Sequence, residues 1–312
     1  MGSFEASQQA DLKSISLFGL LEGNLEAAND LVSACKEKGF FYLDFRDAST
    51  CKMLTQVDDL ITVGREVFKL SLEEKEQYST EKHLPSRLQG CIHNNGLWGD
   101  DTLELPLALE ENLPLIKTWM SEVHGYTECI LSILSKALNL PYNLKDCHRK
   151  DVPSSANMAM LNYLPWGSTD EKVGNMAHTD MGTLTVVFTK NDGLQVFEPE
   201  TEQWYYIKPR SGHAVVNVGD SLRFLSNGAL ASNLHRVVPP ANPEGLDKFS
   251  CIYFLRPEFD AKFTSRDGKV MNSVEWHNQK YALFREASLD AKKHGAMLTG
   301  RNGYLGATTE TV

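Results

Sequence analysis

The stretch NMAHTDMGTLTVVFTK, residues 175–190, places a histidine and an aspartate two positions apart, directly before a run of β-branched residues. Residues i and i+2 of a strand point to the same face, so His178 and Asp180 can direct an imidazole and a carboxylate at one point. The same stretch also fits a polar turn that enters a core strand. Whether it is a metal site or a turn depends on what the rest of the chain supplies.

Short strands dominate the sequence around this stretch. After Asn157 the apolar period changes from helical to two, and Gly, Asn, Asp and Pro separate the apolar runs. The predicted strands are NMAMLNYL, GTLTVVF, GLQVF, QWYYIK, HAVVNVG, SLRFLS, NLHRVV and KFSCIYFL. Strands at such close spacing are typical of a sandwich or barrel, of which the double-sheet jelly roll is the eight-stranded member.

Helices are predicted on both sides of this β region. A helix from about residue 25 ends at Gly39, before an apolar strand at 40–45, and others are expected over about 53–70, 113–140 and 273–294. A shorter helix begins with a capping box of Ser71 and Glu74. Residues 83–111 lack periodicity and are predicted to form a long functional loop. We therefore expect a mixed α/β fold with a mainly helical region over 1–145, a jelly-roll core over 146–262, and a C-terminal helix and tail over 263–312.

Composition limits the kinds of partner. A formal net charge of −10 on 312 residues argues against binding to nucleic acid or to an anionic membrane, since both attract clustered Lys and Arg. The six cysteines are scattered without a CxxC pair, which is typical of reduced thiols in a cytoplasmic protein. No secretory leader and no run as long as a membrane span is evident. We expect a cytoplasmic protein with a small-molecule partner.

A third metal ligand must come from the β region, where His213 and His235 are the remaining histidines. His213 opens a predicted strand and is expected at its edge, whereas His235 lies within NLHRVV, where alternation can turn it inward. Two histidines and one carboxylate with open positions form the facial triad of non-haem Fe(II) oxygenases. A structural zinc site would use four protein ligands. The predicted metal ligands are therefore His178, Asp180 and His235, with no catalytic residue beyond the metal centre.

A candidate carboxylate anchor follows in the next strand. Lys248 and Ser250 are two positions apart, so an ammonium and a hydroxyl can bind one carboxylate of a co-substrate whose other end chelates the metal. The alternative is a solvated lysine beside an ordinary strand serine.

Taken together, these segments resemble the isopenicillin N synthase-like family of Fe(II)/2-oxoglutarate-dependent dioxygenases. The resemblance covers nearly the whole chain, and its segments follow in family order: ISLFGLLEGNLEAANDLVSACKEKGFFYL, LNYLPW, HTDMGTLTVV, GLQVF, VVNVGDSLRFLSNG, LHRVVPP and KFSCIYFLRP. It implies a double-stranded β-helix with Fe(II) held by His178, Asp180 and His235. It also implies 2-oxoglutarate held by Lys248 and Ser250, with Asn162 as a further contact. The segment DKFSCIYFLRP is more similar to fungal members than to plant ones.

The resemblance implies an oxygenase that uses Fe(II), 2-oxoglutarate and O2 to oxidise a C–H bond of a small molecule. Hydroxylation, desaturation and oxidative ring closure are the expected outcomes, in specialised metabolism, and a monomer is expected. Substrate contacts are predicted in the long loop and on the strands, at Arg87, His93, Trp98, Phe197 and Phe254.

Alternative functions remain open at this stage. The family usually has arginine at the position of Lys248 and tyrosine at that of Leu164. Both differences favour an iron-dependent oxidase that takes electrons from its substrate or from ascorbate in place of 2-oxoglutarate. A non-catalytic small-molecule receptor and a zinc hydrolase are the remaining alternatives, although a receptor needs no complete triad and no motif places a Glu as general base.

Overall fold

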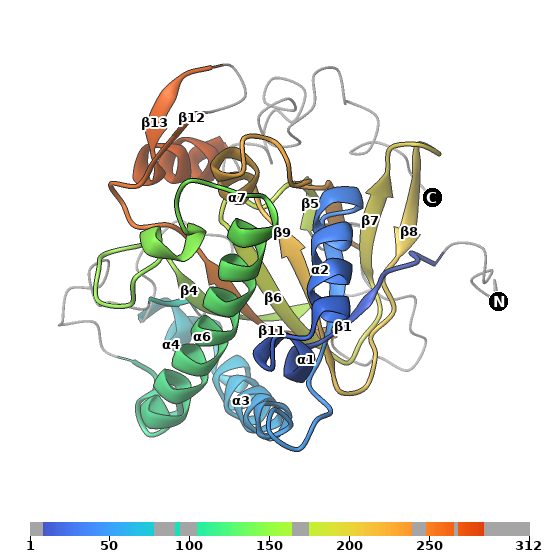
Figure 1. Cartoon of the computed structure of the whole chain (residues 1–312). Coiled ribbons are helices and arrows are strands. Elements are labelled where there is room, and N and C mark those ends of the chain that lie inside the picture. The colour runs from blue at the N-terminus through green and yellow to red at the C-terminus, as the bar shows by residue number, and fades with distance from the viewer. Residues whose placement is uncertain are drawn as a thin grey trace.

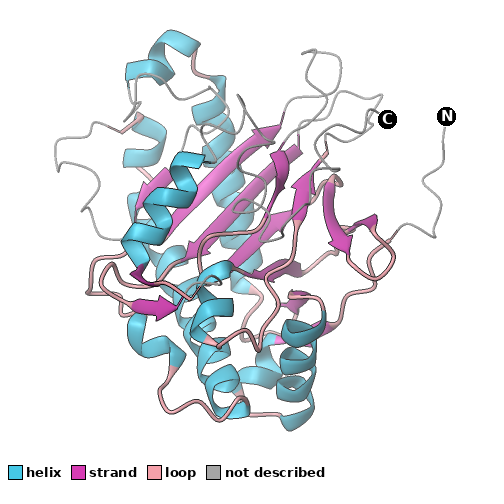
Figure 2. Cartoon of the chain, turned by 90° about the horizontal axis from the view of Figure 1, so that it is seen from above, coloured by secondary structure: helices cyan, strands magenta, loops and turns pink. Residues whose placement is uncertain are grey.

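Two facing β-sheets form the centre of the molecule, and helices cover the outer side of the larger sheet (Figure 1, Figure 2). The computed structural model describes residues 9–77, 91–93, 105–163, 175–238, 248–264 and 268–283. The larger sheet has seven strands in the order β1-β2-β9-β6-β11-β4-β3, and the smaller has four in the order β5-β10-β7-β8. Only the β1–β2 pair among these strands is parallel. This is the expected jelly roll, a double-stranded β-helix within a mixed α/β fold.

The strands of the two large sheets are β1 (Ser14–Ser16), β2 (Phe40–Asp44), β3 (Cys91–His93), β4 (Asn157–Tyr163), β5 (Asn175–His178), β6 (Leu184–Thr189), β7 (Leu194–Glu198), β8 (Gln203–Tyr206), β9 (His213–Val218), β10 (His235–Val237) and β11 (Lys248–Leu255). A separate hairpin pairs β12 (Lys262–Thr264) with β13 (Val270–Asn272). The helices are α1 (Leu17–Leu21), α2 (Leu25–Glu37), α3 (Lys52–Lys69), α4 (Leu72–Gln77), α5 (Leu107–Glu110), α6 (Leu113–Ala137) and α7 (Asp220–Leu225), and residues 273–283 are also helical.

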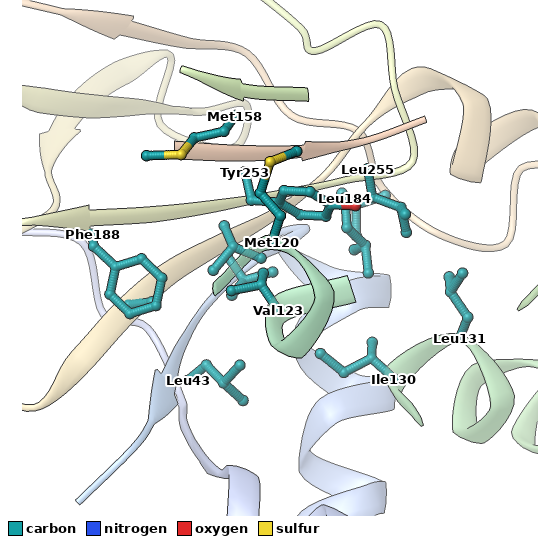
Figure 3. Close-up of a cluster of buried hydrophobic side chains, with 14 of the residues drawn as sticks. Leu43, Met120, Val123, Ile130, Leu131, Met158, Leu184, Phe188, Tyr253 and Leu255 are labelled. Atoms are coloured by element: carbon teal, nitrogen blue, oxygen red, sulfur yellow. The ribbon is translucent and has the colours of Figure 1, made fainter. Parts of the chain in front are cut away.

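Strand β11 lies between two apolar cores, and its side chains point alternately toward one and the other. Every second residue from Phe249 to Leu255 faces the helices and joins the main core, which lies between the larger sheet and helices such as α3 and α6. Figure 3 shows this core, with Met120 and Val123 of α6 beneath Tyr253. A smaller core between the sheets unites residues of both: Phe40, Tyr42, Leu194, Val196, Val215 and Val237 are among its members. Lys248, Ser250 and Phe254 therefore face the space between the sheets.

Most of the predicted helices are confirmed. Helices α2, α3 and α6 lie where the periodicity places them, and the C-terminal helix begins at 273, although its expected end near 294 lies outside the described residues. The capping box is present before α4. Ser71 Oγ accepts a hydrogen bond from the Glu74 backbone N–H at 3.2 Å, and Glu74 Oε2 accepts one from the Ser71 N–H at 2.8 Å.

Two predictions of local structure are wrong. The segment SLRFLS is not a strand but most of α7, whose first backbone N–H groups bond to the loop that follows β5. The expected loop over 83–111 contains strand β3 and helix α5 among its described residues. Strand β3 forms because its backbone pairs with the edge of β4, a tertiary contact that periodicity does not predict.

Division of the chain into parts at 145 and 262 stays a prediction. The region before 145 contributes β1, β2 and β3 to the larger sheet, and β2 pairs with β9 along its whole length. Among the described residues, none of the helices has both the length and the apolarity that crossing a bilayer requires.

Close packing of α3 on the sheet requires a glycine. A Cβ added at Gly64 would lie 2.5 Å from Phe249 Cζ and 2.6 Å from Met160 Sδ. We expect Gly64→Ala to lower the free energy of unfolding by about 1–3 kcal/mol, because overpacking outweighs the better helix propensity of alanine. Gly125 in α6 is the matched control, since a Cβ there meets nothing within 4 Å and Gly125→Ala should stabilise by up to about 1 kcal/mol. Urea denaturation measures both; equal stabilisation by the two substitutions would contradict this packing.

Candidate metal centre

His178, Asp180 and His235 meet at one point between the sheets. His178 ends β5 and His235 begins β10, and the two residues stand directly opposite each other in the antiparallel pair. Asp180 Oδ1 lies 3.5 Å from His178 Nε2 and 3.6 Å from His235 Nε2, and all three side chains are buried. Within the described part of the chain, this is the one group of three or more such side chains whose ligand atoms converge within 4.8 Å.

Hydrogen bonds to the main chain orient both candidate histidine ligands. His178 Nδ1 donates to the Met176 carbonyl at 2.7 Å, and His235 Nδ1 donates to the Asn233 carbonyl at 3.2 Å. A carbonyl only accepts, so the proton is on Nδ1 of each ring, and each Nε2 presents a lone pair to the centre. This is the arrangement that metal-binding histidines use.

The carboxylate of Asp180 is oriented in the same way. Its Oδ2 atom accepts hydrogen bonds from Thr185 Oγ1 and, at 2.7 Å, from Asn217 Nδ2. Oδ1 is therefore the oxygen directed at the two Nε2 atoms. Two neutral imidazoles and one carboxylate with its second oxygen already engaged fit a divalent iron with open positions. Sequence reasoning missed Thr185 and Asn217; an asparagine within the apolar strand AVVNV is the signal that could have revealed the second.

Burial and neighbouring charges favour an ionised Asp180 and a neutral His235. Burial raises the pKa of Asp180, but His235, His178 and the Asn217 amide outweigh burial and bring the pKa well below its ordinary value. Burial, reinforced by His178, lowers the pKa of His235 to about 4. At neutral pH Asp180 and His235 thus have the protonation states that metal binding requires.

Residues 178–183, which we call the metal loop, lie against the start of α7. The N–H of Asp220 donates to the Asp180 carbonyl at 2.7 Å, and the N–H of Ser221 donates to the Gly182 carbonyl at 2.9 Å. A Cβ at Gly219 would lie 2.2 Å from the Gly182 carbonyl oxygen, so this approach requires glycine. The same contacts explain why the segment predicted as a strand begins a helix.

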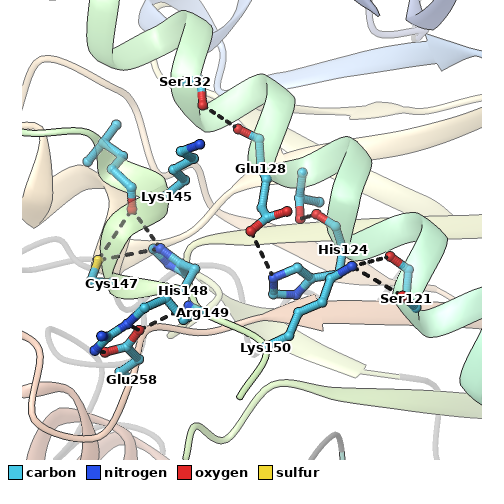
Figure 4. Close-up of polar contacts among 12 residues, drawn as sticks. Ser121, His124, Glu128, Ser132, Lys145, Cys147, His148, Arg149, Lys150 and Glu258 are labelled. Carbon is cyan, nitrogen blue, oxygen red and sulfur yellow. Dashed lines mark hydrogen bonds and ion pairs between the residues drawn. The ribbon is translucent and has the colours of Figure 1, made fainter. Parts of the chain in front are cut away.

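A buried histidine fixes the far end of the metal loop. His148 Nδ1 donates to the Leu144 carbonyl at 2.7 Å, and its Nε2 accepts from Thr183 Oγ1 at 2.6 Å. Burial lowers the pKa of His148 to about 4, which keeps the ring neutral for this role. Figure 4 shows His148 beside the ion pair of Arg149 with Glu258. His148 is a further residue that sequence reasoning missed, since nothing local marks it.

Lys248 and Ser250, the predicted co-substrate anchor, lie on one face of β11. Both are buried on the face of β11 that carries Phe254, whose register partner Thr185 contacts Asp180. Lys248 Nζ donates to the Asn191 carbonyl at 2.9 Å. Burial lowers the pKa of Lys248 to about 8, against a smaller opposing effect of Asp192. Lys248, Ser250 and the candidate metal ligands therefore lie on the sheet faces that enclose the same space.

Asn162 and Phe197 do not face this space. Asn162 pairs with Phe249, whose side chain belongs to the helix-covered core, so its strand position faces away from Lys248 and Ser250. Phe197 follows Val196, the register partner of His235, and packs outside with Ala177, Leu234 and Trp204. Both placements differ from the expected ones for one reason: the sequence alone does not fix which residues of a strand point inward.

Of the other residues singled out from the sequence, the structure describes some and not others. Phe254 is partly exposed and faces the metal side of the sheet. His93 stands opposite Asn157 in the β3–β4 register, in the same row across the sheet as Phe254. Arg87, Trp98 and Leu164 lie outside the described residues.

Known proteins share this sequence pattern. Residues 155–257 match the sequence profile of the 2OG-Fe(II) oxygenase superfamily, and residues 11–96 match that of the non-haem dioxygenase in morphine synthesis N-terminal region. The 2-oxoglutarate-dependent dioxygenase gloE of Glarea lozoyensis is 34% identical over 96% of this chain and 95% of its own length. The 2-oxoglutarate-dependent dioxygenase iboH of Amanita muscaria is 41% identical over 58% of this chain and 90% of its own length.

Solved structures share the fold. A full-length Neurospora crassa protein, crystallised in complex with alpha-KG and 5-formyluracil, superposes with a TM-score of 0.73 and 20% identity over 90% of this chain and 99% of its own. The rice dioxygenase for auxin oxidation gives a TM-score of 0.66 at 20% identity, over 87% of this chain and 95% of its own.

Loss of the Asn217 amide should weaken metal binding. Asn217→Ala removes one of the two donors to Asp180 Oδ2, and loss of a group that orients a metal ligand typically costs about 10–100-fold in metal affinity. Calorimetric titration of the metal-free protein with Mn(II) measures the change in metal affinity. Asn191→Ala is a control, because the Asn191 side chain accepts a hydrogen bond from the Phe249 backbone N–H at 3.3 Å rather than from a group bonded to Asp180. Equal Mn(II) affinity in the parent and Asn217→Ala would contradict the role assigned to this amide.

Proposed function

The chain belongs to the 2OG-Fe(II) oxygenase superfamily, and we propose that His178, Asp180 and His235 hold its Fe(II) while Lys248 and Ser250 hold 2-oxoglutarate. One observation carries the assignment: the three ligand atoms converge within 4.8 Å with both Nδ1 atoms and Asp180 Oδ2 already engaged elsewhere. The protein is an enzyme, an Fe(II)- and 2-oxoglutarate-dependent oxygenase. Membership of this family favours 2-oxoglutarate use over the oxidase, receptor and hydrolase alternatives.

Each residue has a separate task in this proposal. The two backbone-bonded histidines would hold Fe(II) through Nε2 and Asp180 through Oδ1, and co-substrate and O2 would bind at the positions that these three ligands leave open. With Fe(II) bound, the centre would use O2 to oxidise a C–H bond of the substrate while 2-oxoglutarate is converted to succinate and CO2. The surrounding apolar residues of both sheets exclude bulk water.

Lys248 replaces an arginine fork with a point charge. Its ammonium bonds to a main-chain carbonyl and is buried, so a carboxylate that arrives beside it gains a charge-assisted hydrogen bond in a low-dielectric setting. Ser250, on the same face of β11, would add a hydroxyl donor. This pair would bind the carboxylate of 2-oxoglutarate that is remote from the metal.

The substrate is a small molecule, and Phe254 is the residue best supported as its contact. Phe254 is only partly buried and lies beside Thr185, which bonds to Asp180. We extend the proposal to His93, whose strand position continues the same row, and to a role in specialised metabolism through hydroxylation, desaturation or oxidative ring closure. A cytoplasmic monomer that binds no nucleic acid, with ascorbate as an auxiliary reductant, completes the proposal.

Removal of the carboxylate ligand tests the centre. Anaerobic addition of Fe(II) and 2-oxoglutarate to the parent should give a weak visible metal-to-ligand charge-transfer band, and Asp180→Ala should abolish both the band and succinate formation. His213→Ala is the control, because His213 lies at the start of β9 beside Ser14 and Asp44 rather than at the triad. Iron binding by the parent without the band would overturn 2-oxoglutarate binding, and a band retained in Asp180→Ala would overturn the ligand set.

The pH dependence of co-substrate binding tests Lys248. A lysine with a pKa of about 8 is cationic below that pH and neutral above it, so KM for 2-oxoglutarate should rise by about tenfold per pH unit beyond 8. Lys248→Arg should remove this rise between about pH 7.5 and 9.5, because arginine stays charged. Steady-state succinate formation at several pH values gives KM. The anchor role fails if the parent and Lys248→Arg share one profile.

A further inference from the structure

The residue between the two neighbouring candidate ligands is itself bonded to distant parts of the chain. Thr179 Oγ1 donates to Asp220 Oδ2 at 3.0 Å and accepts from Lys280 Nζ at 2.6 Å. Lys280 also forms an ion pair with Asp220. The three side chains are 2% exposed or less, although Lys280 belongs to the C-terminal helical segment 273–283 and Asp220 begins α7.

A fully buried lysine calls for an explanation beyond stability. Lysine is almost never fully buried unless it is paired, and a buried ion pair often stabilises a fold no better than apolar residues of the same volume. Arg223 also donates to Asp220 Oδ1 at 3.1 Å, so the carboxylate would keep a cation without Lys280. What Lys280 adds is a link between the C-terminal helix and the metal loop.

The C-terminal helix touches the metal loop at a second point. Trp276, one turn before Lys280, donates its indole N–H to the Met181 carbonyl at 3.2 Å. Its ring packs edge-on against Phe224 of α7 at 5.1 Å, so the helix and α7 approach the loop together. Lys280 and Trp276 thus hold the residues immediately before and after Asp180.

We propose that Lys280 and Trp276 are positioning residues that act through Thr179 and Met181 to fix the backbone on both sides of Asp180. The inference rests on the proposed metal ligands. Docking of the C-terminal helix and metal binding are then coupled, and the coupling is reciprocal: the helix strengthens metal binding, and the metal protects the helix. Such support beyond the ligands commonly changes metal affinity by about 10–100-fold.

Thr179→Val separates this role from general stability. Valine keeps the shape of the side chain and leaves the Lys280–Asp220 ion pair in place, but it breaks both hydrogen bonds to the metal loop. We expect Mn(II) affinity of the metal-free full-length protein to fall by about tenfold or more, measured by calorimetry. Lys280→Met should weaken Mn(II) binding in the same direction. Leu134→Ala, a cavity in α6 within the helix-covered core, controls for lost stability, and the comparison is made at matched loss of Tm.

Hydrogen exchange provides the reciprocal measurement. Mn(II) should slow amide exchange in residues 273–283 of the parent beyond any change in α6, and this extra protection should be absent in Thr179→Val. Unchanged Mn(II) affinity in Thr179→Val, or a fall no larger than in Leu134→Ala, would overturn the positioning role. Asp180→Ala separates failure of the ligand assignment from failure of the positioning role. If Asp180→Ala leaves Mn(II) binding intact, the ligand assignment itself is wrong. If Asp180→Ala abolishes Mn(II) binding and Thr179→Val does not affect it, only the positioning role is refuted.

Discussion

The opposition of His178 and His235 across the β5–β10 pair is the constraint on which the site depends. Two imidazoles that face each other in register leave only one space for a metal, and Asp180 must reach it from the loop that leads into β6. Because β6 belongs to the other sheet, the metal loop has to cross between the sheets. The close approach of Gly219 to Gly182, which only glycine permits, sets the path of that crossing.

Buried charge is arranged in two separate groups around this path. On the side facing the space between the sheets, Asp180 is ionised and hydrogen-bonded, and Lys248 is a cation bonded only to a carbonyl among the interactions described for it. On the other side, Asp220 and Lys280 neutralise each other. A cation without a bonded carboxylate is costly in such a setting, and in the proposed site a dicarboxylate co-substrate would relieve that cost on binding. The proposed binding of Fe(II) and a dicarboxylate therefore accounts for the buried charges of Asp180 and Lys248 between the sheets.

The features that could be predicted from the sequence are those that depend on residues close together in the chain. The spacing of His178 and Asp180, the helical period of α6 and the Ser71 capping box each depend on neighbours a few positions away. Strand register and contacts between distant parts of the chain could not be predicted from the sequence. Register places Asn162 on the face of β4 that lies away from Lys248, because a shift of one residue reverses the face of a strand. The prediction for SLRFLS is wrong because its helix is capped by a loop forty residues earlier. Lys280 carries no local signal, since its partners lie 60 and 101 residues away.

Strand β11 shows why fold and chemistry are hard to separate in this protein. Its odd-numbered residues from Phe249 to Leu255 build the core under α3 and α6, and its even-numbered residues place Lys248, Ser250 and Phe254 on the face toward the smaller sheet. A register shift of one residue would place the lysine in the apolar core and phenylalanine at the anchor. Pairing with β4 over seven residues and with β6 over six holds that register. The same contacts that stabilise the sheet therefore keep the buried Lys248 on the face of β11 that lies toward the smaller sheet.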